Sequence, residues 1–139
     1  MNEQDNITFI QKMYAAFGEG DVQTLLDSVT DNAEWINYGP DTIPYAGSRS
    51  GKTQIREFFQ VIGETSTGSK IVAENFVAQG DTVVATGRYQ AKVSATGVEI
   101  DTPIAHVFTV RNGKVTRWEG FSDTALVAAA YTGRAAAGR

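Results

Sequence analysis

The segment Val98–Phe121 reads VEIDTPIAHVFTVRNGKVTRWEGF. Its two halves, Val98–Val110 and Lys114–Phe121, are rich in β-branched and aromatic residues, a composition typical of β-strands. Asn112-Gly113 lies between them and suits a type I′ turn, because both residues tolerate a positive φ. The segment therefore predicts an antiparallel β-hairpin.

The same pattern continues on the N-terminal side of this hairpin. Lys70–Gln79 and Thr82–Val93 have the composition of strands and are separated by Gly80-Asp81. Thr96-Gly97 then separates the second of them from Val98. We expect four long strands in an antiparallel meander, which will twist and curl strongly.

The first half of the chain has helical periodicity instead. Ile7, Ile10, Tyr14 and Phe17 recur at three- and four-residue steps, as on the buried face of an amphipathic helix. The other expected elements are a short helix from Val22 to Val29, a strand at Ala33–Tyr38, a loop at Gly39–Gly51, a helix from Ser50 to Glu64, and a helical turn or two at Thr124–Tyr131.

This order of elements predicts an α+β fold. A strongly curved antiparallel sheet packed on three helices of the N-terminal half gives a cone-shaped, barrel-like fold, whose cavity suits a small molecule. The length of 139 residues suits one domain, which we place at residues 1–131, with 132–139 as a frayed tail.

The composition disfavours several classes of function. The chain has no cysteine and a single histidine, His106, so we expect no disulfide, metal site or cofactor. A net charge of −4 without a basic cluster argues against nucleic acid as a partner. No apolar run approaches the ~20 residues that cross a bilayer, and the polar start lacks a secretory pattern. We therefore expect a cytoplasmic protein without membrane contact.

Four stretches together resemble a known family: YAAFGEGD at Tyr14–Asp21, YAGSRSGK at Tyr45–Lys52, PIAHVFTVRNGKV at Pro103–Val115 and WEGFSDTAL at Trp118–Leu126. The chain is similar to the SnoaL-like polyketide cyclase and ketosteroid-isomerase-like branch of the nuclear-transport-factor-2-like superfamily. The resemblance implies the cone fold and a homodimer formed through the sheet face away from the helices. It leaves activity open, because this fold hosts isomerases, cyclases, dehydratases, epoxide hydrolases and non-catalytic binding domains.

The ketosteroid isomerase mechanism does not transfer to this sequence. By the resemblance, the aspartate base corresponds to Asn37 and the oxyanion-holding acid to Ala105. The tyrosine of the first helix corresponds to Met13, one residue from Tyr14. All three roles therefore lack their side chain.

Two related chemistries transfer in part. Of the water-activating set of limonene-epoxide-hydrolase-like enzymes, Asn37 and Arg88 fit, whereas Gln90 and Gly120 stand at the aspartate positions. SnoaL-like cyclases use a carboxylate of the last strand as base, with a histidine nearby. Glu119 and His106 are the closest candidates for those two roles.

Alternation along the strands, placed by the resemblance, predicts which side chains face the cavity. The expected inward set is Trp35, Asn37, Thr86, Arg88, Gln90, Ala105, Val107, Trp118 and Gly120. His106 alternates with Ala105, so we expect it on the opposite face in a structural or interface role, with a general base as the alternative.

Arg88 is the sharpest candidate, because a guanidinium in a pocket needs an anionic ligand or a carboxylate. The competing interpretation is an arginine on a partly wet sheet, paired with Asp101 or Glu119. We expect catalytic roles for Arg88 and Asn37, and for His106 in the alternative in which it is a general base. The expected substrate-binding residues are Tyr14, Trp35, Phe58, Gln90, Val107 and Trp118.

Two functions remain in competition. One is a lyase, cyclase or isomerase that acts by proton transfer on a small hydrophobic or carbonyl-containing metabolite. The other is a binding module that holds such a molecule without chemistry. A limonene-epoxide-hydrolase-like hydrolase is a third alternative.

Overall fold

The computed structural model describes residues 2–134, which form four helices and one six-stranded sheet. The strands are β1 (Val29–Asn37), β2 (Gly47–Ser50), β3 (Ser66–Gln79), β4 (Thr82–Val93), β5 (Glu99–Arg111) and β6 (Lys114–Ser122). The helices are α1 (Glu3–Gly18), α2 (Val22–Asp27), α3 (Gly51–Thr65) and α4 (Thr124–Tyr131). The predicted α+β class is confirmed.

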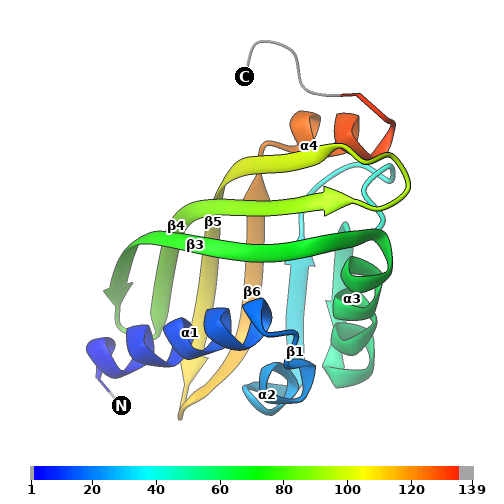
Figure 1. The fold of residues 1–139 in the computed structure, drawn as a ribbon. Helices are drawn as coiled ribbons and strands as arrows, with labels where there is room; N and C mark the ends of the chain where they lie inside the picture. Colours follow the sequence, from blue (N-terminus) through cyan, green and yellow to red (C-terminus); the bar gives the residue numbers. More distant parts are fainter. Residues whose placement is uncertain (1, 135–139) are drawn as a thin grey trace.

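The sheet has the order β2-β1-β6-β5-β4-β3 (Figure 1). The four predicted long strands form the predicted meander, and the turn between β5 and β6 has Asn112 at φ 51° and Gly113 at φ 74°, as a type I′ turn requires. The prediction of a purely antiparallel sheet is wrong, because β1 pairs with β6 in parallel. The sheet is therefore mixed, strongly curved and not closed into a barrel.

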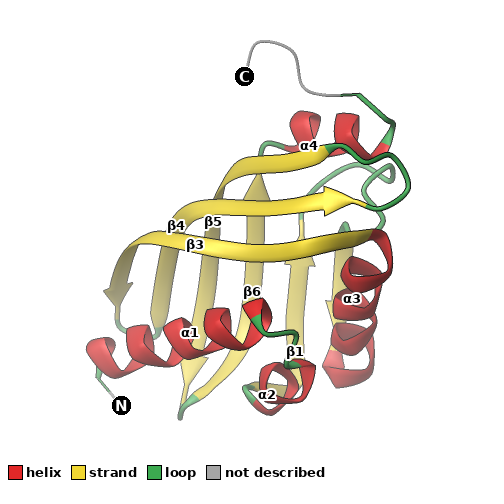
Figure 2. Cartoon of the chain, viewed as in Figure 1, coloured by secondary structure: helices red, strands yellow, loops and turns green. Residues whose placement is uncertain are grey.

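Figure 2 shows β3, β4 and β5 bending past α1 and α3, with α4 at the opposite end of the molecule from α2. Helix α3 buries Ile55, Phe58, Phe59 and Ile62, which recur at the three- and four-residue spacing of one helix face. Helix α1 begins with a capping box between Asn2 and Asp5, which satisfies backbone donors of its first turn. The buried apolar side chains of the helices and the sheet form one cluster.

Some boundaries differ from the predictions. Strand β1 begins at Val29 rather than Ala33, and the predicted loop Gly39–Gly51 contains the short strand β2. This strand exists because β1 offers it a free edge, on which Trp35 pairs with Arg49. Of the tail predicted at 132–139, residues 135–139 lie outside the described residues, and Arg134 N donates to the carbonyl of Ala129 in α4 at 2.8 Å.

The expected inward face is right for β1 and β6 and wrong for β4 and β5. On β4 the buried positions are Val83, Ala85, Gly87, Tyr89, Ala91 and Val93. On β5 they are Ile100, Thr102, Ile104, His106, Phe108 and Val110. Because alternation has a period of two, a shift of one residue moves every side chain of a strand to the other face. Thr86, Arg88, Gln90, Ala105 and Val107 therefore face outwards.

None of the helices in residues 2–134 is long and apolar enough to cross a membrane.

Candidate functional site

The concave side of the sheet and the helices enclose a partly open cavity of about 80 Å³. Aromatic and aliphatic side chains make most of its wall, among them Trp35, Phe58, Phe59, Phe108 and Trp118. Its polar groups come from tyrosines, the two tryptophan N–H groups, Asn37, His106 and Ser122, and no described residue that lines it is Asp, Glu, Lys or Arg. The cavity is therefore an apolar space with a few neutral hydrogen-bonding groups.

A tyrosine–histidine pair is the main polar feature of the cavity. The hydroxyl of Tyr14, from α1, lies 2.9 Å from Nδ1 of His106, from β5. Burial lowers the pKa of His106 from 6.5 to about 3, and burial raises the pKa of Tyr14 above its ordinary value. Both groups are uncharged at neutral pH, and Nε2 of His106 has no hydrogen-bond partner within residues 2–134.

The expectation that His106 faces away from the cavity is wrong. His106 pairs across the sheet with Gly120 on β6 and with Ala85 on β4, so it shares the inward face with them. Its ring meets the Trp118 ring edge-on, with the ring centres 5.0 Å apart. The imidazole is thus held by contacts with the Trp118 ring and the Tyr14 hydroxyl.

Two tryptophans build one wall of the cavity. The rings of Trp35 and Trp118 stack with their centres 4.6 Å apart, and Phe58 meets both edge-on. Both tryptophans are 4% exposed, and all three residues line the cavity, as predicted. Because the stack consists of flat rings packed against each other, it presents a rigid apolar surface.

Gly120 makes room for this arrangement. A Cβ at position 120 would lie 2.4 Å from a ring carbon of Trp118 and 2.9 Å from Oδ1 of Asn37. Any other residue would therefore displace the indole or the amide. Asn37 is half-buried at the end of β1, pairs with Gly120 in the sheet and lines the cavity, as predicted.

Arg88 is outside the cavity. Its Nε donates to Oδ1 of Asp101 at 2.6 Å, and its side chain is 40% exposed. This is the alternative that paired it with Asp101. Gln90 and Val107, also predicted to bind substrate, lie on the same outer face and do not line the cavity. Asn37 and Arg88 are therefore on opposite faces, and the partial epoxide-hydrolase set is not assembled.

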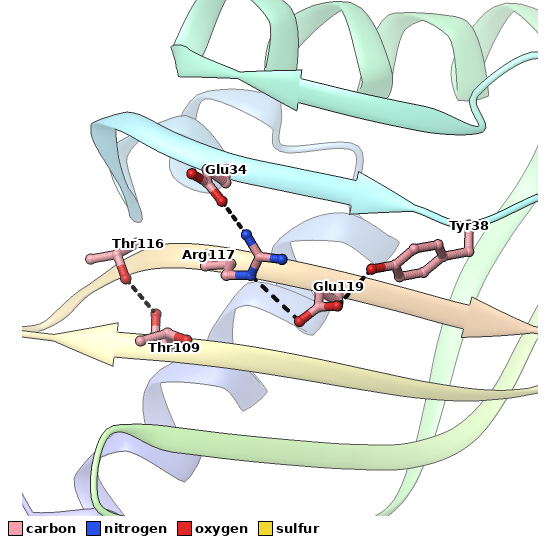
Figure 3. Close-up of polar contacts among 6 residues, drawn as sticks. All are labelled: Glu34, Tyr38, Thr109, Thr116, Arg117 and Glu119. Atoms are coloured by element: carbon pink, nitrogen blue, oxygen red, sulfur yellow. Dashed lines mark hydrogen bonds and ion pairs between the residues drawn. The ribbon is translucent and has the colours of Figure 1, made fainter.

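Glu119, the candidate carboxylate base, also faces outwards. It accepts a hydrogen bond from Tyr38 at 2.8 Å and one from Arg117, which also pairs with Glu34 (Figure 3). Figure 3 shows these side chains lying along β1 and β6 on one surface of the sheet. The one arginine and two carboxylates of this region therefore interact with one another outside the cavity.

Several lining residues were not singled out from the sequence. The main ones are Tyr45, Phe59, Tyr89, Ile43, Phe108 and Phe121. Ile43 and Tyr45 come from the segment between β1 and β2, so this segment covers part of the cavity. Phe108 and Tyr89 share the parity of the apolar positions of their strands, which is the signal that identifies them.

The fold agrees with the comparisons to known proteins. The chain belongs to the SnoaL-like domain family, whose model matches residues 10–118. This confirms the resemblance stated from the sequence. No curated protein matches the chain.

Solved structures include several similar chains. An NTF2-like protein from Burkholderia xenovorans LB400 is 30% identical, with a TM-score of 0.81 over 94% of this chain and 98% of that one. TerC, co-crystallised with polyporic acid, is 27% identical, with a TM-score of 0.82 over 91% of this chain and 98% of that one. A putative SnoaL-like polyketide cyclase from Jannaschia sp. CCS1 shares the fold at 20% identity, with a TM-score of 0.81 over 94% and 93% of the two chains.

Proposed function

We propose that the chain binds a small, largely apolar, carbonyl-containing metabolite in the cavity and isomerises or cyclises it by proton transfer. The observation that carries this proposal is the hydrogen bond between Tyr14 and His106 inside an otherwise apolar cavity. In this proposal His106 accepts the proton, Tyr14 supplies one, and Asn37 orients the carbonyl. Arg88 has no role in it.

The pair can move a proton without forming a charged side chain. In one state Nδ1–H of His106 donates to the Tyr14 oxygen, Nε2 is an acceptor, and the Tyr14 O–H is free for the substrate carbonyl. A proton leaves the carbon next to the carbonyl for Nε2, the Nδ1 proton moves to the Tyr14 oxygen, and the Tyr14 proton moves to the carbonyl oxygen. The product is an enol, and the proton count is unchanged.

An imidazole with a pKa of about 3 is a weak base, and this sets a requirement on the site. Proton abstraction by a weak base is effective when a hydrogen-bond donor reaches the oxygen on which charge develops. Tyr14 is such a donor, and the surrounding apolar wall strengthens its hydrogen bond because the local dielectric is low. Transfer through both groups at once avoids a separated charge pair.

The comparisons support a small organic ligand. Membership of the SnoaL-like family and the similarity to TerC, which was co-crystallised with polyporic acid, both favour it. The cavity wall of Trp35 and Trp118 suits a flat ring, since stacked aromatic surfaces contact one another over a large area.

The test is hydrogen exchange from deuterated water into a panel of enolisable ketones, with polyporic acid binding measured in parallel. We expect exchange that Tyr14→Phe and His106→Asn each lower by at least about a hundredfold, the low end of general acid–base contributions. Arg88→Gln is the matched control on the outer face and should keep full activity. Exchange that persists in His106→Asn, or that is lost in Arg88→Gln, would contradict the proposal.

A binding module without catalysis is the second candidate. The absence of a carboxylate among the described residues that line the cavity favours it. Polyporic acid would then bind with a defined stoichiometry while every ketone of the panel stays unexchanged.

We also propose a homodimer formed through the outer face of the sheet. Tyr38 and Phe121 support it, because their rings stack with centres 4.8 Å apart while each stays 41% exposed. Phe121 also touches the cavity, so its ring is shared between the cavity lining and the exposed surface. Sedimentation should give twice the chain mass of 15.0 kDa, and a monomer at micromolar concentration would contradict the proposal.

A further inference from the structure

The cavity and its surroundings differ sharply in charge. The arginines and carboxylates of the neighbouring strands pair on the outer face, as Arg88 does with Asp101 and Arg117 with Glu34. The described residues that line the cavity include no permanently charged side chain. A ligand anion inside would therefore lose its hydration without gaining an opposite charge, which is costly in an apolar space.

The hydrogen-bonding pattern of the Tyr14–His106 pair points the same way. When Tyr14 donates to Nδ1, its oxygen is an acceptor towards the cavity and Nε2–H of His106 is a donor. When Nδ1–H donates to Tyr14, the roles exchange, and the cavity again meets one donor and one acceptor. A neutral hydroxyl, which both donates and accepts, satisfies the pair in either state. A phenolate or enolate oxygen only accepts, and it would face a lone pair.

We propose that the cavity selects aromatic phenols or enols in their protonated, uncharged form, with the ligand hydroxyl bonded to the Tyr14–His106 pair. This inference rests on the proposed use of the cavity as the ligand site. It names the ligand class and its protonation state, and it predicts that an acidic ligand takes up one proton from solution when it binds.

The titratable groups that line the cavity allow this assignment. They are Tyr14 from α1, Tyr45 from the segment before β2, Tyr89 from β4 and His106 from β5. Burial raises the pKa of each tyrosine and lowers that of the histidine, so all four stay neutral at neutral pH. The pH dependence of binding therefore belongs to the ligand hydroxyl.

One cation approaches the cavity wall from behind. The guanidinium of Arg49 lies over the Phe58 ring, 5.4 Å from its centre, and donates to the carbonyl of Tyr45 at 2.9 Å. It is not among the residues that line the cavity. Arg49→Gln therefore tests whether this charge contributes to binding.

The experiment compares two single-ring probes, para-nitrophenol and para-nitroanisole, across the pKa of the phenol. Both probes carry a single aromatic ring and differ only in that the methyl ether cannot donate a hydrogen bond, so their comparison isolates the ligand hydroxyl. We expect bound para-nitrophenol to keep the absorption band of the phenol at every pH. Its affinity should fall about tenfold per pH unit above its solution pKa, because one proton is taken up on binding. The affinity of para-nitroanisole should not change with pH.

The variants separate the possible outcomes. Tyr14→Phe should lower the affinity for para-nitrophenol and leave the affinity for para-nitroanisole unchanged. A merely structural role of Tyr14 would change both affinities. Arg49→Gln should change neither probe. A phenolate band in the complex, or an affinity that stays level through the phenol pKa, would overturn the inference while the site stands. If neither probe binds at any pH, the proposed site itself fails.

Discussion

The inner and outer faces of the sheet are formed by alternate residues of the same strands, yet their polar groups differ. The outer face carries charged side chains, and the inner face carries neutral ones. On β6, Arg117 and Glu119 face outwards and pair with each other, whereas Trp118 and Gly120 face the cavity. The ion pairs of the outer face are at least partly exposed, so each pair adds little to stability. At the inner face the Tyr14–His106 pair is uncharged, with His106 buried and Tyr14 partly buried. The comparison indicates that any chemistry in the cavity depends on groups that stay neutral.

The most severe way to break this contrast is to place a charge on the inner face. Ala85 is fully buried beside His106 on β4, and Thr86 is its exposed neighbour on the other face. Ala85→Asp should lower the free energy of unfolding by more than about 4 kcal/mol, because it buries an unpaired carboxylate. Thr86→Asp should change it by less than about 0.5 kcal/mol. Urea denaturation measures both, and equal effects would contradict the assignment of the two faces.

A smaller effect is expected at Gly120, where the inner face needs space rather than neutrality. Gly120→Ala should lower the free energy of unfolding by about 1–3 kcal/mol, since the added Cβ would overlap the Trp118 ring. The same substitution should weaken the binding of polyporic acid. Gly63→Ala is the matched control, because no atom lies within 4 Å of a Cβ there and the residue is inside α3. It should stabilise the protein by about 0.5–1 kcal/mol. If Gly120→Ala changed neither the stability nor the binding of polyporic acid, the Trp118 ring would not be fixed as described.

The third prediction concerns pH. His106 has a pKa of about 3 in the folded protein and 6.5 as its ordinary value, so between these values only the unfolded chain binds its proton. The free energy of unfolding should therefore fall by about 1.4 kcal/mol per pH unit as the pH decreases from 6.5 towards about 3. Above pH 6.5 the neutral histidine contributes its full share of the stability. Comparing unfolding free energies of the native protein and His106→Gln isolates the effect, because the other acid-sensitive groups are common to both. Parallel pH curves would contradict a buried neutral histidine.

The smallest effect is expected on the outer face. Arg88→Gln removes the pair with Asp101, which is partly exposed and worth about 0–1 kcal/mol. Binding of polyporic acid should be unchanged, since Arg88 does not line the cavity. Isothermal titration of the variant tests this, and a lost affinity would place the arginine in the site after all.

The sequence predicted the meander and the helices well because their signals are local. The Asn112-Gly113 turn and the apolar stripe of α3 depend on neighbours a few residues away. Strand β2 was missed, because its four residues form a strand only where the edge of β1 is available. The parallel pairing of β1 with β6 is likewise a contact between distant segments, which no local pattern encodes.

The lining of the cavity was predicted in part. Trp35, Asn37, Phe58 and Trp118 were placed correctly in the cavity. The resemblance shifted the alternation of β4 and β5 by one residue, so that Arg88 was wrongly placed inside the cavity. The sequence itself contained the correcting signal, because the apolar residues of β4 alternate with Thr86, Arg88 and Gln90. The same parity places His106 inside. Its bond to Tyr14 joins residues 92 positions apart and required the structure.

The most direct test of a neutral Tyr14–His106 pair is an NMR pH titration of the imidazole. The chain contains one histidine, so its signals need no further assignment. We predict that the ring resonances stay at their neutral positions as the pH falls from 8 through ~6.5, the ordinary histidine pKa, and move only at much lower pH. A midpoint near the ordinary value would show that the imidazole is solvated or paired with an acid, and it would contradict the uncharged cavity on which the proposed chemistry depends.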